Sequence, residues 1–342
     1  MKIILDVMGG DNPPEAIVRG AIMAKESVSS RIVLVGNETM IREALAKHGA
    51  DENDFDIVHS DGVITMEDGP MCIVQKKKDS SMAKALTLLA QGEGDACVSC
   101  GNTGALFTGA TLIVRRIKGV RRAALATIMP YDNDVMLIDS GANVTVTADY
   151  LVHFAYLGSI YMRKVYGLEA PRVAIINNGE EKHKGTPLVL EARELMLGDE
   201  YINFVGSVEG QELPYAKCDI AVCDGFTGNV ILKTSEGLSN YITDAAMAAI
   251  KAAGNASEEV LEAMEKIRRR FDSTEYGGAV MIGLTKPVVK AHGSSDSNAI
   301  KNALICAEKY AKSDVTSDIE KAFEVLDPLA QLANGGKNDS KK

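Results

Sequence analysis

The sequence predicts an α/β protein in which helices cover a buried sheet. Short apolar runs, typical of buried strands, alternate along the chain with segments of helical period. Glycine and small polar residues follow the end of one such run after another. With 342 residues, of which 46% are hydrophobic and 25% charged, the chain can bury a large core. These features favour an ordered globular protein over a disordered chain.

Ten apolar runs are expected to form the strands. They lie at residues 2–7, 31–36, 55–58, 95–99, 123–129, 135–139, 172–177, 202–206, 218–223 and 287–291. Residues that favour helix ends mark several of the helices between them. Asn37 is expected to open a helix that Gly49 closes, and Thr186 to open another. In this second helix Leu190 and Leu197 lie seven residues apart, the spacing of a buried stripe.

Residues 236–271 are expected to form a helical hairpin. Gly254 closes its first arm, and Asn255 with Glu258 predicts a capping box that starts the second. The second arm carries an apolar face, formed by Val260, Leu261, Met264, Ile267 and Phe271, beside the basic run Arg268, Arg269 and Arg270. These faces either pack on their own subunit or form contacts outside it.

No Pro/Gly/Ser-rich linker divides the chain. Residues 1–335 are therefore expected to form one unit of two interleaved lobes. The polar, glycine-containing end of the chain is expected to be a disordered tail at 336–342.

One local pattern occurs twice. Residues 95–104 and 219–228 share an Asp, a Val, two glycines and a Thr in the same register, and in each an apolar run ends at Gly-x-Thr-Gly before a helical segment. Such a turn points unpaired backbone N–H groups beyond the strand end, where they can bind an anion, although glycine there also serves backbone conformation alone. The repetition predicts two similar half-units that face each other across a cleft.

Glycine and small polar residues recur at the ends of the predicted strands. The motifs are "MGGD" at 8–11, "SCGNTG" at 99–104, "DSGAN" at 139–143, "NNGEE" at 177–181, "CDGFTGN" at 223–229 and "AHGSS" at 291–295. Because α/β sheets bind ligands at the carboxyl ends of their strands, these motifs predict a small anionic ligand. The sequence contains neither the nucleotide P-loop nor the dinucleotide-binding glycine fingerprint, and neither the H-E-x-x-H nor the G-x-S-x-G hydrolase motif.

Charge and cysteine content restrict the function further. A net charge of −10 argues against nucleic-acid binding, which needs a basic face. Asp6 interrupts the apolar start, and no run approaches the ~18 apolar residues of a membrane-spanning helix, so a cytoplasmic protein is expected.

Four of the six cysteines, Cys97, Cys100, Cys218 and Cys223, have a spacing that could hold zinc. Positions three apart on a strand point to opposite faces, which favours reduced thiols over a metal site.

The motifs "DVMGGDNPPEAIVRGA", "KKKDSSM", "SCGNTGAL", "DSGANV", "NNGEEKHKG", "CDGFTGNVILK", "EYGGA" and "KAHGSSDSNAI" occur in this order. Together they resemble the bacterial phosphate acyltransferase family known as PlsX, over almost the whole chain. Cys100, Ser140 and Asn178 depart from the residues usual in that family, which affects packing detail.

The resemblance implies the transfer of an acyl group from acyl-acyl carrier protein to inorganic phosphate, giving acyl phosphate for phospholipid synthesis. It implies a fold similar to isocitrate and isopropylmalate dehydrogenases, with three α/β/α layers and two intertwined lobes. It further implies a homodimer that associates peripherally with the membrane, and a site without a cofactor or metal.

In this reaction phosphate is the nucleophile and a thiolate leaves, so positioning and charge stabilisation should dominate catalysis. The N–H groups of Gly101–Gly104 and Gly225–Gly228 are expected to hold phosphate and the carbonyl oxyanion, helped by the hydroxyls of Thr103 and Thr227. Uncharged amide donors are expected from Asn102, Asn143 and, as a catalytic residue, Asn229.

Lys184 is the preferred phosphate ligand, and His292 is the candidate proton carrier. Lys233 is a second cation near the motifs, although a lysine at such a position is more often solvated. Carboxylates beside phosphate would repel it, so those of Asp11, Asp224 and Glu180 are expected to orient a cation or cap helices. The substrate-binding set is completed by Gly9, Gly10 and Ser294.

Acyl carrier protein is acidic, so its docking surface should be basic. The candidate clusters are Arg115, Arg116, Lys118, Arg121 and Arg122; then Lys76, Lys77 and Lys78; then Arg268, Arg269 and Arg270.

Two other functions remain open at this point. A decarboxylating dehydrogenase of the same fold would need a metal-binding set of aspartates, and no such D-x-x-x-D element is expected in the sequence. A non-catalytic module that binds phosphate or acyl carrier protein would differ from the enzyme only in the absence of turnover.

Overall fold

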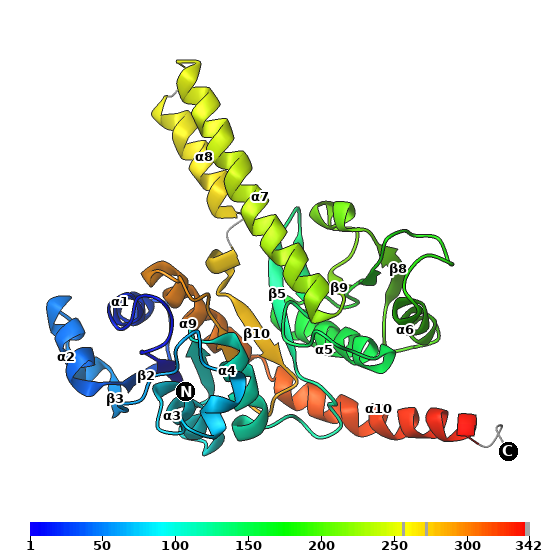
Figure 1. Ribbon diagram of the computed structural model, residues 1–342, viewed down its shortest axis with the longest axis horizontal. Helices are drawn as coiled ribbons and strands as arrows, with labels where there is room; N and C mark the ends of the chain where they lie inside the picture. The colour runs from blue at the N-terminus through cyan, green and yellow to red at the C-terminus, as the bar shows by residue number, and fades with distance from the viewer. Residues whose placement is uncertain (255–256, 271–272, 339–342) are drawn as a thin grey trace.

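A computed structural model describes residues 1–254, 257–270 and 273–338, and its strands form one continuous sheet (Figure 1). The strands are β1 (Lys2–Asp6), β2 (Arg31–Gly36), β3 (Asp56–His59), β4 (Ala96–Ser99), β5 (Ala124–Pro130), β6 (Asp134–Ile138), β7 (Val173–Ile176), β8 (Phe204–Val208), β9 (Ile220–Val222), β10 (Ala279–Ile282) and β11 (Val288–Lys290). Their order across the sheet is β3-β2-β1-β4-β11-β10-β5-β6-β9-β7-β8. All ten predicted strands are confirmed. The sequence prediction missed β10, whose four apolar residues follow two glycines and precede a third.

The helices are α1 (Glu15–Ala24), α2 (Glu38–Lys47), α3 (Ser81–Ala90), α4 (Thr103–Gly109), α5 (Ala148–Tyr166), α6 (Pro187–Leu197), α7 (Gly225–Ala252), α8 (Glu258–Arg270), α9 (Ser297–Lys312) and α10 (Val315–Asn338). The predicted caps are confirmed, because the Asn37 side chain accepts from the Met40 N–H and the Thr186 hydroxyl accepts from the Val189 N–H. The predicted stripe of α6 is wrong. Leu197 is 57% exposed, and α6 instead buries Ala192, Arg193 and Met196.

The sheet contains two sets of parallel strands that run in opposite directions. Strands β1, β2, β3, β4 and β11 are parallel to one another, as are β6, β7, β8 and β9. Antiparallel pairing of β11 with β10, β10 with β5 and β5 with β6 joins the two sets. The chain builds the first set, crosses to the second and returns through β10, β11 and α9. The two lobes are therefore intertwined, as predicted.

Helices cover both faces of the sheet, which makes three layers. Successive strand residues alternate between faces: Ile3 and Leu5 belong to one core cluster and Ile4 to another. The first cluster runs across both lobes beneath α1, α2, α5, α9 and α10. The opposite face carries two separate clusters, one beneath α3 and α4 and the other beneath α7 and the 3-10 turn Gly210–Tyr215. The functional pocket lies on this divided face.

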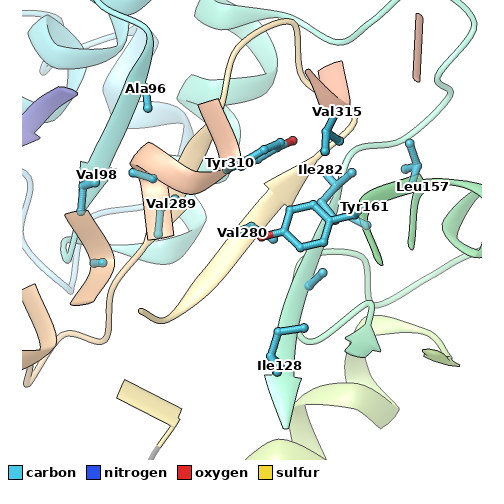
Figure 2. Packing of buried hydrophobic residues seen from close by; sticks show 14 of the residues in the cluster. Ala96, Val98, Ile128, Leu157, Tyr161, Val280, Ile282, Val289, Tyr310 and Val315 are labelled. Atoms are coloured by element: carbon cyan, nitrogen blue, oxygen red, sulfur yellow. The ribbon is translucent and has the colours of Figure 1, made fainter. Parts of the chain in front are cut away.

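Aromatic side chains join the two lobes on the continuous face. Tyr161 of α5 and Tyr310 of α9 meet edge to face, with 5.3 Å between ring centroids. Figure 2 shows the two rings beside Val280 and Ile282 of β10. Because α5 belongs to the second lobe and α9 packs on the first, this contact fixes the lobes in one body.

The hairpin leaves this body as two long helices, α7 and α8 (Figure 1). Gly254 has a positive φ of 72° at the end of the first arm, as predicted, because glycine alone adopts this conformation without strain. The first arm is longer than predicted, since α7 begins at Gly225. Asn255 and Phe271, for which a cap and a face position were predicted, lie outside the described residues. Residues 336–338 of the predicted tail are helical, in α10, and 339–342 lie outside the described part.

Candidate functional site

The strand-end turns of both lobes meet near the centre of the sheet. Strands β4 and β11 end at Ser99 and Lys290, and Lys290 lies in register with Ala279, which pairs with Thr127 of β5. From the other lobe, β6 ends opposite Ala126 of β5. The carboxyl ends of the two strand sets therefore approach each other across β5 and β10.

A pocket of about 330 Å³ lies between these turns. Its floor includes Leu125 and Thr127 of β5 and Ala279 of β10. Its walls include Asp11, Thr103, Lys290, His292 and Ser294 from one lobe and Ser140, Gly141, Asn229 and Lys233 from the other. Five residues predicted for the site therefore come together here: Asp11, Thr103, Asn229, His292 and Ser294.

A lysine and a histidine meet at this pocket from opposite lobes. Lys233 Nζ, on α7, lies 3.1 Å from His292 Nε2 and 2.7 Å from a carboxylate oxygen of Glu236. His292 Nδ1 lies 2.8 Å from the Ser294 hydroxyl, and it accepts from the Ser294 backbone N–H at 3.3 Å. A neutral imidazole has only one unprotonated nitrogen, so Nε2 cannot accept from the Lys233 ammonium while Nδ1 accepts from this N–H. Lys233 is therefore part of the site and not simply solvated.

The pocket contains a second lysine that was not predicted from the sequence. Lys290 is 7% exposed at the end of β11, and its ammonium donates to the Ala291 carbonyl. Burial lowers the pKa of Lys290 to about 8. Burial, with the nearby Lys233 charge second, also lowers the pKa of His292. The lowered pKa of His292 favours its neutral form near neutral pH, whereas Lys290 still carries charge there.

The first Gly-x-Thr-Gly turn keeps donors free for a ligand. The N–H groups of Asn102, Thr103 and Gly104 have no hydrogen-bond acceptor among the described residues, and α4 runs directly into a π-helical turn at Ala110–Val114. Gly101 packs closely, because an added Cβ would lie 2.5 Å from the Met82 methyl carbon. In this turn the Asn102 amide is committed to the fold: its Nδ2 donates to carbonyls of the 65–68 loop, and its Oδ1 caps α4.

The second turn differs from the first, which corrects the expectation that both present free amides. The Gly225 N–H donates to the Asn143 carbonyl at 2.8 Å, and the Gly228 N–H donates to the Asp224 carbonyl. The Asp224 carboxylate accepts from the N–H groups of Phe226 and Thr227 and from the Thr227 hydroxyl. A carboxylate of the chain thus occupies the anion position at the start of α7. Asp224 caps this helix, one of its two expected roles.

Asn143 is also held within the fold. Its Nδ2 donates to the Ala123 carbonyl and, at 2.6 Å, to the Asp139 carboxylate. That carboxylate also accepts from the backbone N–H groups of Gly141, Ala142 and Asn143. These bonds build the "DSGAN" turn, whose Gly141 lines the pocket. The Asn143 amide has no hydrogen left for a substrate in this arrangement.

Two predicted residues lie elsewhere. Lys184 and Glu180 follow β7, which is separated from β6 by β9, and neither lines the central pocket. Glu180 is exposed and pairs with Lys217 at 3.4 Å. The sequence placed Lys184 at a glycine-rich strand end, but strand order cannot be derived from that pattern. The lysines that line the central pocket are Lys233 and Lys290.

Gly9 and Gly10 pack against the first turn. An added Cβ on Gly9 would lie 2.7 Å from the Gly101 nitrogen, and on Gly10 2.8 Å from the Gly293 carbonyl oxygen. Gly10 also has a positive φ of 83°. The Asp11 N–H donates to that same carbonyl at 2.9 Å. These glycines therefore let the turns that follow β1, β4 and β11 pack closely together. This packing fixes the wall of the pocket that the first lobe forms.

The cysteines do not form a metal site in the described part of the chain. Cys97 and Cys100 are buried in clusters on opposite sheet faces, as their spacing predicted, and all six thiols are free. No group of three or more His, Cys, Asp or Glu residues suited to a metal was found among the described residues. The expectation that the chain has no D-x-x-x-D element is wrong, because Asp314 and Asp318 have this spacing. Asp318 of α10 pairs with Lys164 at 2.7 Å, and neither aspartate lines the central pocket.

The three basic clusters differ in whether their charged groups are paired with other residues or exposed to solvent. Lys77 is bound to the Asp68 carboxylate and the Val63 carbonyl, and Arg268 and Arg269 lie near Glu265 at the base of the hairpin. The segment from Arg115 to Arg122 leads into β5 beside the "DSGAN" turn, through the bond between Asn143 and the Ala123 carbonyl. Arg115, Arg116, Lys118 and Arg122 of this cluster are exposed.

Comparison with known proteins places the chain among acyltransferases. A family model described as "Fatty acid synthesis protein" matches residues 1–318. A phosphate acyltransferase from Thermoanaerobacter pseudethanolicus is 40% identical over 95% of this chain and 98% of its own length. One from Clostridioides difficile is 40% identical over 94% of this chain and 96% of its own.

Solved structures share the fold at low sequence identity. A phosphotransacetylase from Streptococcus pyogenes has a TM-score of 0.64 at 19% identity, covering 91% of this chain and 94% of its own. A 4-hydroxythreonine-4-phosphate dehydrogenase, named as putative, from Salmonella typhimurium has a TM-score of 0.53 at 13% identity, covering 90% and 98%. The fold alone therefore does not separate acyl transfer from dehydrogenation, whereas the sequence relatives do.

Proposed function

The chain belongs to the phosphate acyltransferase family, and from this membership we propose that it transfers a fatty acyl group from acyl-acyl carrier protein to inorganic phosphate. The product would be an acyl phosphate that supplies phospholipid synthesis. The observation that carries the proposal is the convergence of Lys233, Lys290 and His292 on one pocket between the lobes. Two cations and a neutral histidine suit a phosphate nucleophile.

Phosphate would bind between the two lysines, near the free N–H groups at the start of α4. One phosphate oxygen attacks the thioester carbonyl carbon, and the carbonyl oxygen becomes an oxyanion. Thr103 and Asn229 line the same pocket, and their side chains have no hydrogen-bond partner among the described residues, so they are the proposed donors to that oxyanion. When the C–S bond breaks, the carbonyl re-forms and acyl phosphate leaves.

His292 is the proposed proton carrier. Its Nε2 lies 3.1 Å from Lys233 Nζ at the pocket, and a neutral imidazole keeps one unprotonated nitrogen, which is the proposed base. It takes the proton that the attacking phosphate loses and returns it to the departing sulfur, which leaves the carrier as a thiol. No proton is gained or lost over the whole reaction, and the enzyme returns to its starting state.

Acyl carrier protein is proposed to dock on the exposed part of the cluster from Arg115 to Arg122. This segment leads into β5, which forms the pocket floor, so a carrier bound there can deliver its thioester to the pocket. We further propose a homodimer that contacts the membrane surface through the hairpin. No helix in the described ranges is both long and apolar enough to cross a bilayer.

The test is phosphate-dependent thiol release from palmitoyl-acyl carrier protein, with acyl phosphate trapped by hydroxylamine. Replacing Lys233→Met should lower kcat/KM about thirtyfold, because a charge-assisted contact worth about 2 kcal/mol is lost. Lys251→Met is the matched control on the same helix, outside the pocket, and should keep the wild-type rate. A loss for Lys184→Met equal to that for Lys233→Met would return Lys184 to the phosphate site.

The same assay separates the rival functions. Binding of phosphate or carrier without thiol release would support a non-catalytic module and contradict the proposal. Reduction of a nicotinamide cofactor in the presence of a hydroxy acid would support the dehydrogenase alternative.

A further inference from the structure

A second hollow adjoins the central pocket. It has a volume of about 740 Å³ and runs along α7. Its other walls are the turn between β5 and β6, the 3-10 turn Gly210–Tyr215 and Ile267 of α8. We call this hollow the α7 groove. Its size falls in the range of small-molecule sites.

The α7 groove and the central pocket share lining residues. Leu232 and Glu236 line both hollows. Beyond them, Ser235, Ser239 and Ile242 follow one another at helical spacing along the groove. From Leu232 to Thr243 the helix rises by about 16 Å at 1.5 Å per residue, so the groove is elongated.

The groove presents apolar side chains to water. Val230, Leu238, Ile242 and Ile267 are 48%, 53%, 56% and 46% exposed. The floor belongs to the third core cluster, which includes Met129, Tyr131 and Leu232. At the border with the central pocket the Glu236 carboxylate binds Lys233, and within the groove the Ser235 and Tyr131 hydroxyls bind each other at 3.0 Å. These polar groups are therefore paired, and an apolar ligand would bury mainly apolar surface.

We propose that the α7 groove holds the acyl chain of the donor thioester, which makes it the chain-length-determining site of the enzyme. The thioester lies at the border formed by Leu232 and Glu236, beside the two lysines, and the chain extends toward Ile242. This inference rests on the proposed function, because it needs an acyl donor whose carbonyl reacts in the central pocket. The groove extends along α7 from residues that it shares with the central pocket, so a longer chain would reach farther from the reacting groups.

A series of plugs along the groove tests the proposal. Ser235→Phe, Ser239→Phe and Ile242→Trp place aromatic rings progressively farther from the reacting groups. Each plug should leave short donors unaffected and reject chains that reach it. The longest accepted chain should therefore decrease in the order Ile242→Trp, Ser239→Phe, Ser235→Phe. Each methylene displaced from the groove should lower kcat/KM about fourfold.

The measurement compares kcat/KM for butanoyl-, octanoyl- and palmitoyl-acyl carrier protein. The matched control is Gly237→Phe on the same helix, since an added Cβ at Gly237 meets nothing within 4 Å and this residue does not line the groove. It should keep the wild-type chain-length profile. Equal loss for all three donors, or an unchanged profile in all three plugs, would overturn the proposal.

Two readouts separate this inference from its alternatives. If wild-type protein releases no thiol from any donor, the proposed function fails, and displacement of bound cis-parinaric acid by palmitate decides the groove alone: loss of binding in Ser239→Phe but not Gly237→Phe supports an acyl-chain site, and equal binding contradicts it. If the plugs change sedimentation from dimer to monomer while the chain-length profile stays constant, the groove is covered by a second copy of the chain, and the inference is wrong.

Discussion

Lys290 is the residue whose environment differs most from what its type suggests. A lysine side chain is usually solvated, but this one ends a strand in the middle of the sheet and is almost fully buried. Burial penalises its charge and brings its pKa to about 8. Lys290 is thus a cation of the central pocket that loses its charge in mildly alkaline solution.

The pH dependence of kcat/KM should therefore have two limbs. Lys290 must be charged to hold phosphate, so the rate should fall as pH rises through about 8. His292 must be neutral to accept a proton, so the rate should fall as pH drops through its pKa, which lies below the usual value of about 6.5. Lys290→Arg should remove the alkaline limb, because a guanidinium stays charged, and His292→Gln should flatten the acid limb.

The measurement is a pH profile of thiol release for the three proteins, with spontaneous thioester hydrolysis subtracted at each pH. Titration of phosphate itself contributes equally to every variant, so the comparison between variants isolates the enzyme groups. An alkaline limb that stays in Lys290→Arg would assign it to another group. An unchanged acid limb in His292→Gln would make this histidine structural.

At the scale of residues, the sequence predicted which polar residues lie at the strand ends. It did not predict which of their side chains are hydrogen-bonded within the fold and which face the pocket. Asn143 and Asn229 both follow glycine turns, yet Asn143 is bound within its own turn whereas Asn229 lines the pocket. Lys290 was not predicted because its position at the end of an apolar strand gives no sign of a partner across the sheet. Distinguishing these cases requires the hydrogen-bond partners, and these come from other parts of the chain.

Among the elements, α7 connects the most functions. Its start packs on the "DSGAN" turn, the part from Asn229 to Thr243 lines the central pocket and the α7 groove, and its far end forms the hairpin (Figure 1). The sequence predicted a strand-to-helix turn at Gly225 and a helix from 236, but not that they are one helix. The glycine at 237 lowers helix propensity between the two patterns, and the packing of α7 offsets it.

The close contact at the start of α7 can be tested by adding a single methyl group. A Cβ on Gly228 would lie 1.9 Å from the Asp139 carbonyl oxygen, which is backbone and cannot rotate away. Gly228→Ala should therefore destabilise the protein by about 3 kcal/mol and lower its Tm by several degrees. Gly237→Ala in the same helix is the control. Its Cβ meets open space, so it should stabilise the protein by up to about 1 kcal/mol.

Thermal unfolding followed by circular dichroism measures both changes. Equal Tm values for Gly228→Ala and wild type would show that α7 can shift on the "DSGAN" turn, and the position of Lys233 would then be less fixed than described. A Cβ on Gly225 would lie 2.8 Å from the Asn143 nitrogen, so a bulkier residue at this position would also strain the fold.

At the scale of the whole molecule, two half-sites are combined into one. Each lobe supplies a set of parallel strands, and the antiparallel strands between them bring the two sets of carboxyl ends together. The repeated Gly-x-Thr-Gly pattern predicted this arrangement of halves. It did not predict that the halves have diverged, with free N–H groups in one turn and an internal carboxylate in the other. A repeat in sequence preserves backbone shape more closely than it preserves the side chains that decide what binds.

The hairpin is the part of the molecule with the least internal support. Most of its described side chains are exposed, including Tyr241 at 72%, and its first arm is rich in alanine near the tip. A long exposed pair of helices with apolar side chains is unusual for an isolated subunit, and small residues allow close approach of another helix. We therefore expect the hairpin to form the dimer contact and to present its tip to anionic lipid. Arg268 and Arg269 lie at its base beside the body, so the basic run is not at the tip.

Replacing residues 244–266 with a short Gly-rich turn tests this expectation. The central pocket and the α7 groove residues up to Thr243 are retained, as is Ile267. The variant should sediment as a folded monomer and should fail to float with vesicles that contain phosphatidylglycerol. Its kcat/KM for a short acyl donor in solution should stay within a few fold of wild type, because Lys233, Lys290 and His292 are untouched. Since the variant keeps the whole pocket, a change in assembly without loss of turnover would assign the dimer and membrane contacts to the hairpin. A variant that remains dimeric and still binds these vesicles would show that another surface performs both roles.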